Sequence, residues 1–345
     1  MLVSQTAAQR EAMHVAAAGA LAEGKWHLAG RILEDLSIHY PQDLLALQVG
    51  HQIDFFTGHS RMLRDRIARA ESHWHPGMPG RPAVLAMLSF GLEETADYAR
   101  AEKLGRLSVE LEPRDAWGWH AVAHVMEMQG RRREGIAWLN QDTPAWSEGS
   151  FFAIHNWWHL ALFHLGLDQI EQAMALLDQR VLESASPLAL DLIDGSALLW
   201  RLQLRGVSVG DRWDALASRW AAVCDTSTYA FNDLHAMMAL VRADRMGDAA
   251  RLLDAQQQAL AAGDDNVGFL NDVGLSATQA IQHFAMGRHA EAAQLLRRVR
   301  PVAARFGGSH AQRDLLDLTL IEAAERSGDG HLADALRRER AFVRP

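Results

Sequence analysis

Residues 120–164 read HAVAHVMEMQGRRREGIAWLNQDTPAWSEGSFFAIHNWWHLALFH, and this stretch indicates both the fold and a candidate site. It contains two His-x-x-x-His patterns, at His120/His124 and at His155/His159. In an α-helix, a spacing of four places both imidazoles on one face, about one turn apart. Apolar residues at these positions would stabilise a helical core more, so the two pairs predict a common polar site.

The stretch also contains one copy of a turn that recurs along the chain. Eight glycines each follow one helical pattern and precede another, at separations of 34, 72, 36, 40, 41, 40 and 41 residues. The interval of 72 contains one more turn, near Glu94-Thr95-Ala96, which lacks the glycine. A period of about 34–41 residues is typical of helix–turn–helix repeats, in which glycine adopts a left-handed conformation after the first helix. The glycines are Gly24, Gly58, Gly130, Gly166, Gly206, Gly247, Gly287 and Gly328.

The sequence predicts an all-α fold, since it contains no alternating β-branched run and no Asn-Gly hairpin. We expect a single tetratricopeptide-like α-solenoid domain over residues 1–345, wound as a right-handed superhelix. Residues 75–82 and 140–149 are expected to form long loops. The predicted helix pairs are 6–22/26–37, 42–57/60–70, 83–95/97–110, 115–128/132–140, 151–165/168–179, 189–204/210–222, 229–243/246–259, 269–284/288–299 and 309–326/329–341.

Composition argues against several functional classes. A net charge of −9 disfavours a nucleic-acid surface, which requires clustered Lys and Arg. No apolar run is long enough to span a membrane, and the N-terminal residues do not have the pattern of a signal peptide. The single cysteine, Cys224, fits a reducing compartment. We therefore expect a cytoplasmic protein that binds neither nucleic acid nor membrane, with a homodimer as an open alternative.

Polar residues recur on the first helix of successive pairs. Because these helices line the concave side of a solenoid, we expect their polar side chains to converge on one enclosed cavity. The recurring positions are His51 and Asp54; Glu93 and Glu94; His120, His124 and Glu127; His155, Asn156 and His159; Asp191 and Asp194; Asn232, Asp233 and His235; Asn271 and Asp272; and His310, Gln312, Arg313 and Asp314.

These residue types favour a site that binds a small polar or anionic molecule and transforms it by histidine acid/base chemistry. Carboxylates would orient the imidazoles, and an arginine would hold an anionic group. The candidate catalytic residues are His120, His124, His155, His159, His235, His310, Asp194, Asp233 and Asp314. The candidate ligand-binding residues are Arg313, Asn156, Asn232, Glu127, Trp157, Trp158 and Gln312.

Three alternatives stay open. The histidines can belong to a satisfied core network, and Ser309 can simply be a helix N-cap. The protein can be a non-catalytic scaffold whose groove binds a peptide or a partner helix. Finally, His120, His124, His155 and His159 can supply four nitrogen ligands to a transition metal such as Zn or Fe, although no motif requires a cofactor and H-E-x-x-H is absent.

Five blocks of this sequence resemble, in the same order, those of the tetratricopeptide repeat protein 38 family. The likeness extends from Phe90-Gly91-Leu92-Glu93-Glu94 to the C-terminal helices. The resemblance implies a tetratricopeptide-like α-solenoid and no particular catalytic mechanism. The usual W-L-G-Y repeat consensus is poorly matched, so a peptide-scaffold function does not follow from it. The blocks are HAVAHVMEMQGRRREGIAWL (120–139), HNWWHLALFHL (155–165), DGSALLWRL (194–202), FNDLHAMMAL (231–240) and GGSHAQRDLL (307–316).

Overall fold

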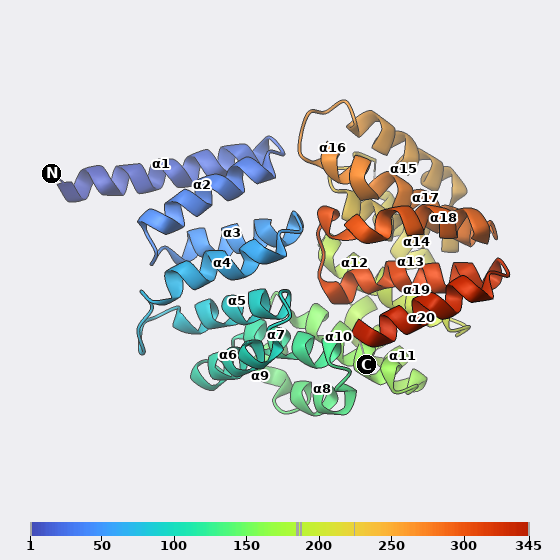
Figure 1. Cartoon of the computed structure of the whole chain (residues 1–345), viewed down its shortest axis with the longest axis horizontal. Helices are drawn as coiled ribbons and strands as arrows, with labels where there is room; N and C mark the ends of the chain where they lie inside the picture. The colour runs from blue at the N-terminus through green and yellow to red at the C-terminus, as the bar shows by residue number, and fades with distance from the viewer. Residues whose placement is uncertain (1, 184–185, 187, 224, 344–345) are drawn as a thin grey trace. The chain divides into compact units, whose positions relative to one another are not determined.

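The protein is an α-solenoid made of consecutive helix–turn–helix pairs, as predicted (Figure 1). The structure, a computed structural model, describes residues 2–183, 186, 188–223 and 225–343, and Cys224 lies outside them. All regular elements within these ranges are helices. The contacts divide the chain into two compact units: unit 1 (residues 1–125 and 141–152) and unit 2 (residues 126–140 and 153–345). A single domain over residues 1–345 stays a prediction.

Unit 1 consists of helices that each pack against the next one in the chain (Figure 1). Small and branched apolar residues such as Ala29, Leu33 and Leu36 are buried between the first of them. The expected loop at 140–149 contains a short helix instead, because Asp142 accepts a hydrogen bond from the Ala145 N–H and starts a turn. The helices are α1 (Leu2–Ala22), α2 (Trp26–His39), α3 (Leu44–Phe56), α4 (Ser60–Glu71), α5 (Arg81–Glu93), α6 (Tyr98–Leu111) and α9 (Thr143–Ser147). Helix α7 (Ala116–Met128) begins in unit 1 and ends in unit 2.

Helix α12 (Ala189–Leu204) is the central helix of unit 2, since it packs against α10 (Ala153–Gly166), α14 (Ala230–Arg242) and α19 (His310–Arg326). Its residues from Leu192 to Leu202 are all buried, including the polar Asp194, Ser196 and Arg201. This helix therefore carries polar side chains into the interior. The remaining helices are α8 (Arg132–Leu139), α11 (Ile170–Leu176), α13 (Arg212–Ala221), α15 (Met246–Ala259), α16 (Asn266–Phe269), α17 (Leu275–Ala285), α18 (His289–Val299) and α20 (Gly330–Val343), with π-helical turns at Leu177–Leu182 and Leu270–Gly274 and a 3-10 helix at Arg300–Phe306.

The turns between paired helices correct one part of the sequence prediction. Gly24, Gly58, Gly130, Gly206, Gly287 and Gly328 have the expected left-handed conformation. In the other turns the left-handed residues are Ala96 (φ 64°), Asp168 (φ 57°) and Asp244 (φ 54°). The prediction that Gly166 and Gly247 have this role is wrong, because these residues lie inside α10 and α15. The left-handed residues are separated by 34, 38, 34, 38, 38, 38, 43 and 41 positions, close to the predicted period of about 34–41.

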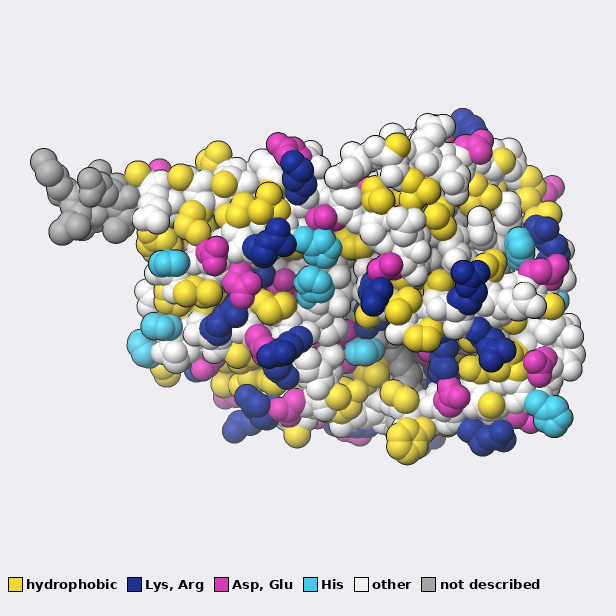
Figure 2. Space-filling view, turned by 45° about the horizontal axis from the view of Figure 1, so that its top comes forward, with side chains coloured by type: hydrophobic (Ala, Val, Ile, Leu, Met, Phe, Trp, Pro, Cys, Tyr) yellow, Lys and Arg dark blue, Asp and Glu magenta, His cyan; other side chains and the backbone are white. Residues whose placement is uncertain are grey.

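The surface is mixed in charge. On the face shown in Figure 2, Lys and Arg side chains are interspersed with Asp and Glu side chains. Among the described helices, none is both long and apolar enough to cross a membrane.

Candidate functional site

Two buried histidines lie on α7 in unit 1. His120 is 4% exposed and His124 is 0% exposed, and their ring centroids are 4.4 Å apart in an edge-to-face arrangement. Both rings pack against Phe90 of α5. The other residues of this part of α7, from Ala121 to Ala123 and Val125, are also completely buried. A helix that is apolar on every side is a core helix, so its imidazoles lie in the interior.

Two carboxylates approach these imidazoles from the end of α5. The helix ends at Glu93, and the chain then turns through the left-handed Ala96. Glu93 is 0% exposed and its Oε2 lies 3.5 Å from Nδ1 of His124, while Glu94 is 4% exposed. One ligand atom each from Glu93, Glu94 and His124 lies within 4.8 Å of the others. Two carboxylate oxygens and one imidazole nitrogen are ligand types that a divalent metal ion accepts.

The second histidine pair lies on α10 in unit 2. His159 is 0% exposed, and the His155 side chain is 18% exposed. Nδ1 of His155 lies 2.9 Å from both carboxylate oxygens of Asp194 on α12. A carboxylate at Nδ1 favours the tautomer with the proton on that nitrogen, which leaves Nε2 as a lone-pair donor. The role of Asp194 as an orienting group stays a prediction.

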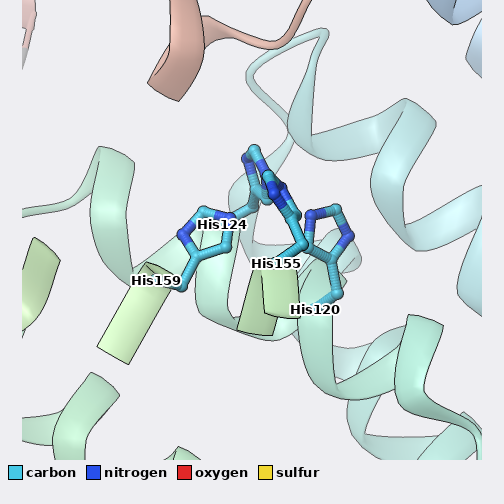
Figure 3. A group of neighbouring side chains, drawn as sticks. All are labelled: His120, His124, His155 and His159. Carbon is cyan, nitrogen blue, oxygen red and sulfur yellow. The ribbon is translucent and has the colours of Figure 1, made fainter. Parts of the chain in front are cut away.

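Figure 3 shows the four imidazoles and the two helices that carry them, α7 and α10. Within unit 1 the ring centroids of His120 and His124 are 4.4 Å apart, and within unit 2 those of His155 and His159 are 4.9 Å apart, again edge to face. Each helix therefore presents one pair of neighbouring imidazoles, as a spacing of four residues predicts.

Two further candidates, His235 and Asp233, are buried in α14. His235 Nδ1 lies 2.8 Å from the carbonyl oxygen of Phe231. Asp233 accepts hydrogen bonds from the Ser227 hydroxyl at 2.6 Å and from the Gln256 amide at 3.0 Å. Burial raises the pKa of Asp233 to about 6. These contacts place Asp233 in a polar network that joins α14 and α15.

The candidates on α19 lie around a separate cavity of about 280 Å³, which His310, Arg313 and Asp314 line. Asp314 accepts two hydrogen bonds of 2.8 Å from Arg340 of α20. Arg313 donates to the carbonyl oxygens of Gly307 and Gly308. Gln312 belongs to a capping box with Ser309, which confirms Ser309 as the N-cap. The capping box and the bonds of Arg313 stabilise the first turn of α19. Asp314 pairs with Arg340 of the neighbouring helix α20.

The remaining candidates differ in burial. Asn156 and Trp158 are completely buried, whereas Asn232, Glu127 and Trp157 are half-buried. The guanidinium of Arg180 lies over the Trp157 ring at 4.9 Å, which indicates a packing role for this tryptophan.

Sequence reasoning did not select three residues that the structure places in these polar interiors. Glu93 and Glu94 were visible as recurring polar positions on a first helix, but they were not included in the predicted site. Arg201 lies in the block DGSALLWRL, seven residues after Asp194, so two helical turns place both on the same face. That spacing is the sequence feature that places Arg201 beside Asp194.

Comparisons with known proteins give a likeness in fold and no family. No family model matches the chain. A solved structure entitled "Crystal structure of APC/C hetero-tetramer Cut9-Hcn1" is similar, with a TM-score of 0.46 and 12% sequence identity. The match covers 89% of this chain and 55% of that chain, so this chain spans about half of its length. A likeness of this degree carries no argument about function, and membership in the tetratricopeptide repeat protein 38 family stays a prediction.

Proposed function

We propose that the protein binds a divalent transition-metal ion, Zn²⁺ or Fe²⁺, at a buried centre that includes Glu93, Glu94 and His124, and that it acts there on a small polar molecule. The observation that carries this proposal is the grouping of these three residues, whose ligand atoms lie within 4.8 Å of one another in a water-excluded interior.

The donor types match this class of metal. His124, Glu93 and Glu94 supply one imidazole nitrogen and two carboxylate oxygens, donor types that both Zn²⁺ and Fe²⁺ accept. A metal with three protein ligands retains an open position at which it polarises a substrate oxygen.

Metal content measured by mass spectrometry tests the proposal. The protein is stripped with EDTA, incubated with Zn²⁺ or anaerobically with Fe²⁺, and desalted. We expect about one equivalent of metal in the unmodified protein and a large loss in His124→Gln, which keeps the side-chain volume. His164→Ala is the control, because His164 lies at the end of α10 and bonds Gln169 near the surface. A folded protein that retains neither metal would refute the proposal.

A protein-binding scaffold is the second candidate function. It is favoured by large apolar side chains that are exposed on the first three helices: Val15 is 72%, Ile38 is 52% and Leu45 is 58% exposed. A scaffold that binds through these helices would tolerate His124→Gln and lose its partner in Ile38→Asp. The metal proposal predicts instead that His124→Gln loses metal binding and that Ile38→Asp retains it.

A further inference from the structure

A buried arginine lies at the centre of unit 2. Arg201 of α12 is 4% exposed, and its Nη2 donates a hydrogen bond of 2.7 Å to the carbonyl oxygen of Ala311 on α19. Its guanidinium lies 5.5 Å from the centre of the Trp158 ring on α10. Arginine stays protonated in proteins and presents five N–H donors in a planar fork, a geometry that suits carboxylate and phosphate groups.

Two buried polar atoms near this arginine have no hydrogen-bond partner within the described ranges of the chain. They are the indole Nε1 of Trp158, which is 0% exposed, and Nε2 of His235, which is 1% exposed. More than nine in ten buried polar groups in proteins have a partner, so each of these atoms requires an explanation. The indole N–H can only donate a hydrogen bond.

His235, in contrast, offers a hydrogen-bond acceptor. Its Nδ1 lies 2.8 Å from the Phe231 carbonyl oxygen, which can only accept, so Nδ1 carries the proton and Nε2 accepts. Burial and the charge of Arg201 lower the pKa of His235 to about 4, which keeps the ring neutral at pH 7. The region therefore offers donors at Arg201 and Trp158 and an acceptor at His235.

We propose that the interior of unit 2 binds a small organic anion that also carries a hydroxyl group. Its carboxylate or phosphate accepts hydrogen bonds from Arg201 and from the indole N–H of Trp158, and its hydroxyl donates to Nε2 of His235. Trp158 also stacks against His155 at a centroid distance of 5.1 Å, which holds the indole ring in place within unit 2. This anion site lies within unit 2 and does not depend on the metal centre proposed in unit 1.

Binding of four probes to EDTA-treated protein tests this inference. Lactate and glycerol phosphate carry both an anionic group and an alcohol hydroxyl, whereas acetate and inorganic phosphate carry the anionic group without an alcohol hydroxyl. By isothermal titration calorimetry we expect lactate or glycerol phosphate to bind at least about tenfold more tightly than acetate or phosphate, since one additional buried hydrogen bond is worth about tenfold.

Two variants and a control locate the site. Trp158→Phe removes an N–H that bonds no described residue, so we expect a folded protein with about tenfold weaker binding. His235→Leu should abolish the preference for lactate over acetate. Trp220→Phe is the control: its N–H bonds the Ser196 hydroxyl at 2.9 Å, so its loss should affect stability but not affinity.

The inference is overturned if none of the four probes binds folded protein, or if Trp158→Phe binds as tightly as the unmodified chain. Because the titration uses metal-free protein, anion binding without metal uptake would refute only the metal centre. Metal uptake without anion binding would refute only the anion site.

Discussion

Acid should destabilise unit 2 through His235, and the effect can be isolated by one substitution. Burial lowers the pKa of this imidazole from 6.5 to about 4. Between these values the unfolded chain binds a proton that the folded chain does not, so the free energy of unfolding falls as the pH falls through this window. Above pH 6.5 the imidazole is neutral in both the folded and the unfolded chain, so the free energy of unfolding carries no penalty from His235 there. The difference between an unfolded pKa of 6.5 and a folded pKa of about 4 corresponds to about 3 kcal/mol.

The assay compares the unmodified chain with His235→Leu by urea denaturation at pH 7.5 and pH 4.5, followed by helical circular dichroism. We expect the loss of stability on acidification to be about 2–3 kcal/mol smaller in the variant, because leucine does not titrate. His51, whose pKa burial lowers to about 3, acts in the same direction in both proteins. Asp233, whose raised pKa has the opposite effect, is also common to both, so the difference isolates His235. Equal pH dependence in the two proteins would show that His235 is not buried as a neutral ring.

Three substitutions test the packing of the helices by the same denaturation assay. Asp54→Ala should cost about 3–5 kcal/mol, because it leaves Arg66 charged and 1% exposed without its two hydrogen bonds of 2.7 and 3.0 Å; a loss below about 1 kcal/mol would show that the pair is not buried. Gly91→Ala should cost about 2 kcal/mol or more, because its Cβ would lie 2.5 Å from a backbone nitrogen of α4. Gly247→Ala, with open space around it, serves as its control and should change stability by about 1 kcal/mol at most. Ser309→Ala should cost about 1 kcal/mol by removing the capping box of α19, and an unchanged midpoint would argue against that cap.

The helices could be predicted from the sequence because their signals are local. Apolar periodicity and turn residues determine where each helix begins and ends, and the predicted pairs match the observed ones closely. The turn after α10 was assigned to Gly166 because glycine adopts the left-handed conformation most easily. In the structure Asp168 has that conformation, and Gly166 is small for another reason: a Cβ there would lie 2.5 Å from the Arg132 side chain. That contact joins residues distant in sequence, which a local pattern does not reveal.

The candidate site was predictable only in part, for the same reason. His120 and His124 could be paired because helical spacing alone places them together. The contact of His124 with Glu93 depends on how α5 packs against α7, and the pairing of Asp314 with Arg340 depends on how α19 packs against α20. Such pairings are decided by contacts between helices, so sequence reasoning identified the polar positions but not their partners.

X-ray absorption at the zinc edge, on protein reconstituted with one equivalent of Zn²⁺, tests the metal centre most directly. The account predicts a first shell of nitrogen and oxygen at about 2.0–2.1 Å with the scattering pattern of imidazole. This pattern should disappear in His124→Gln and persist in His164→Ala. Zinc that is not retained, or a shell without imidazole in the unmodified protein, would contradict the proposal that this buried group of histidines and glutamates binds a metal.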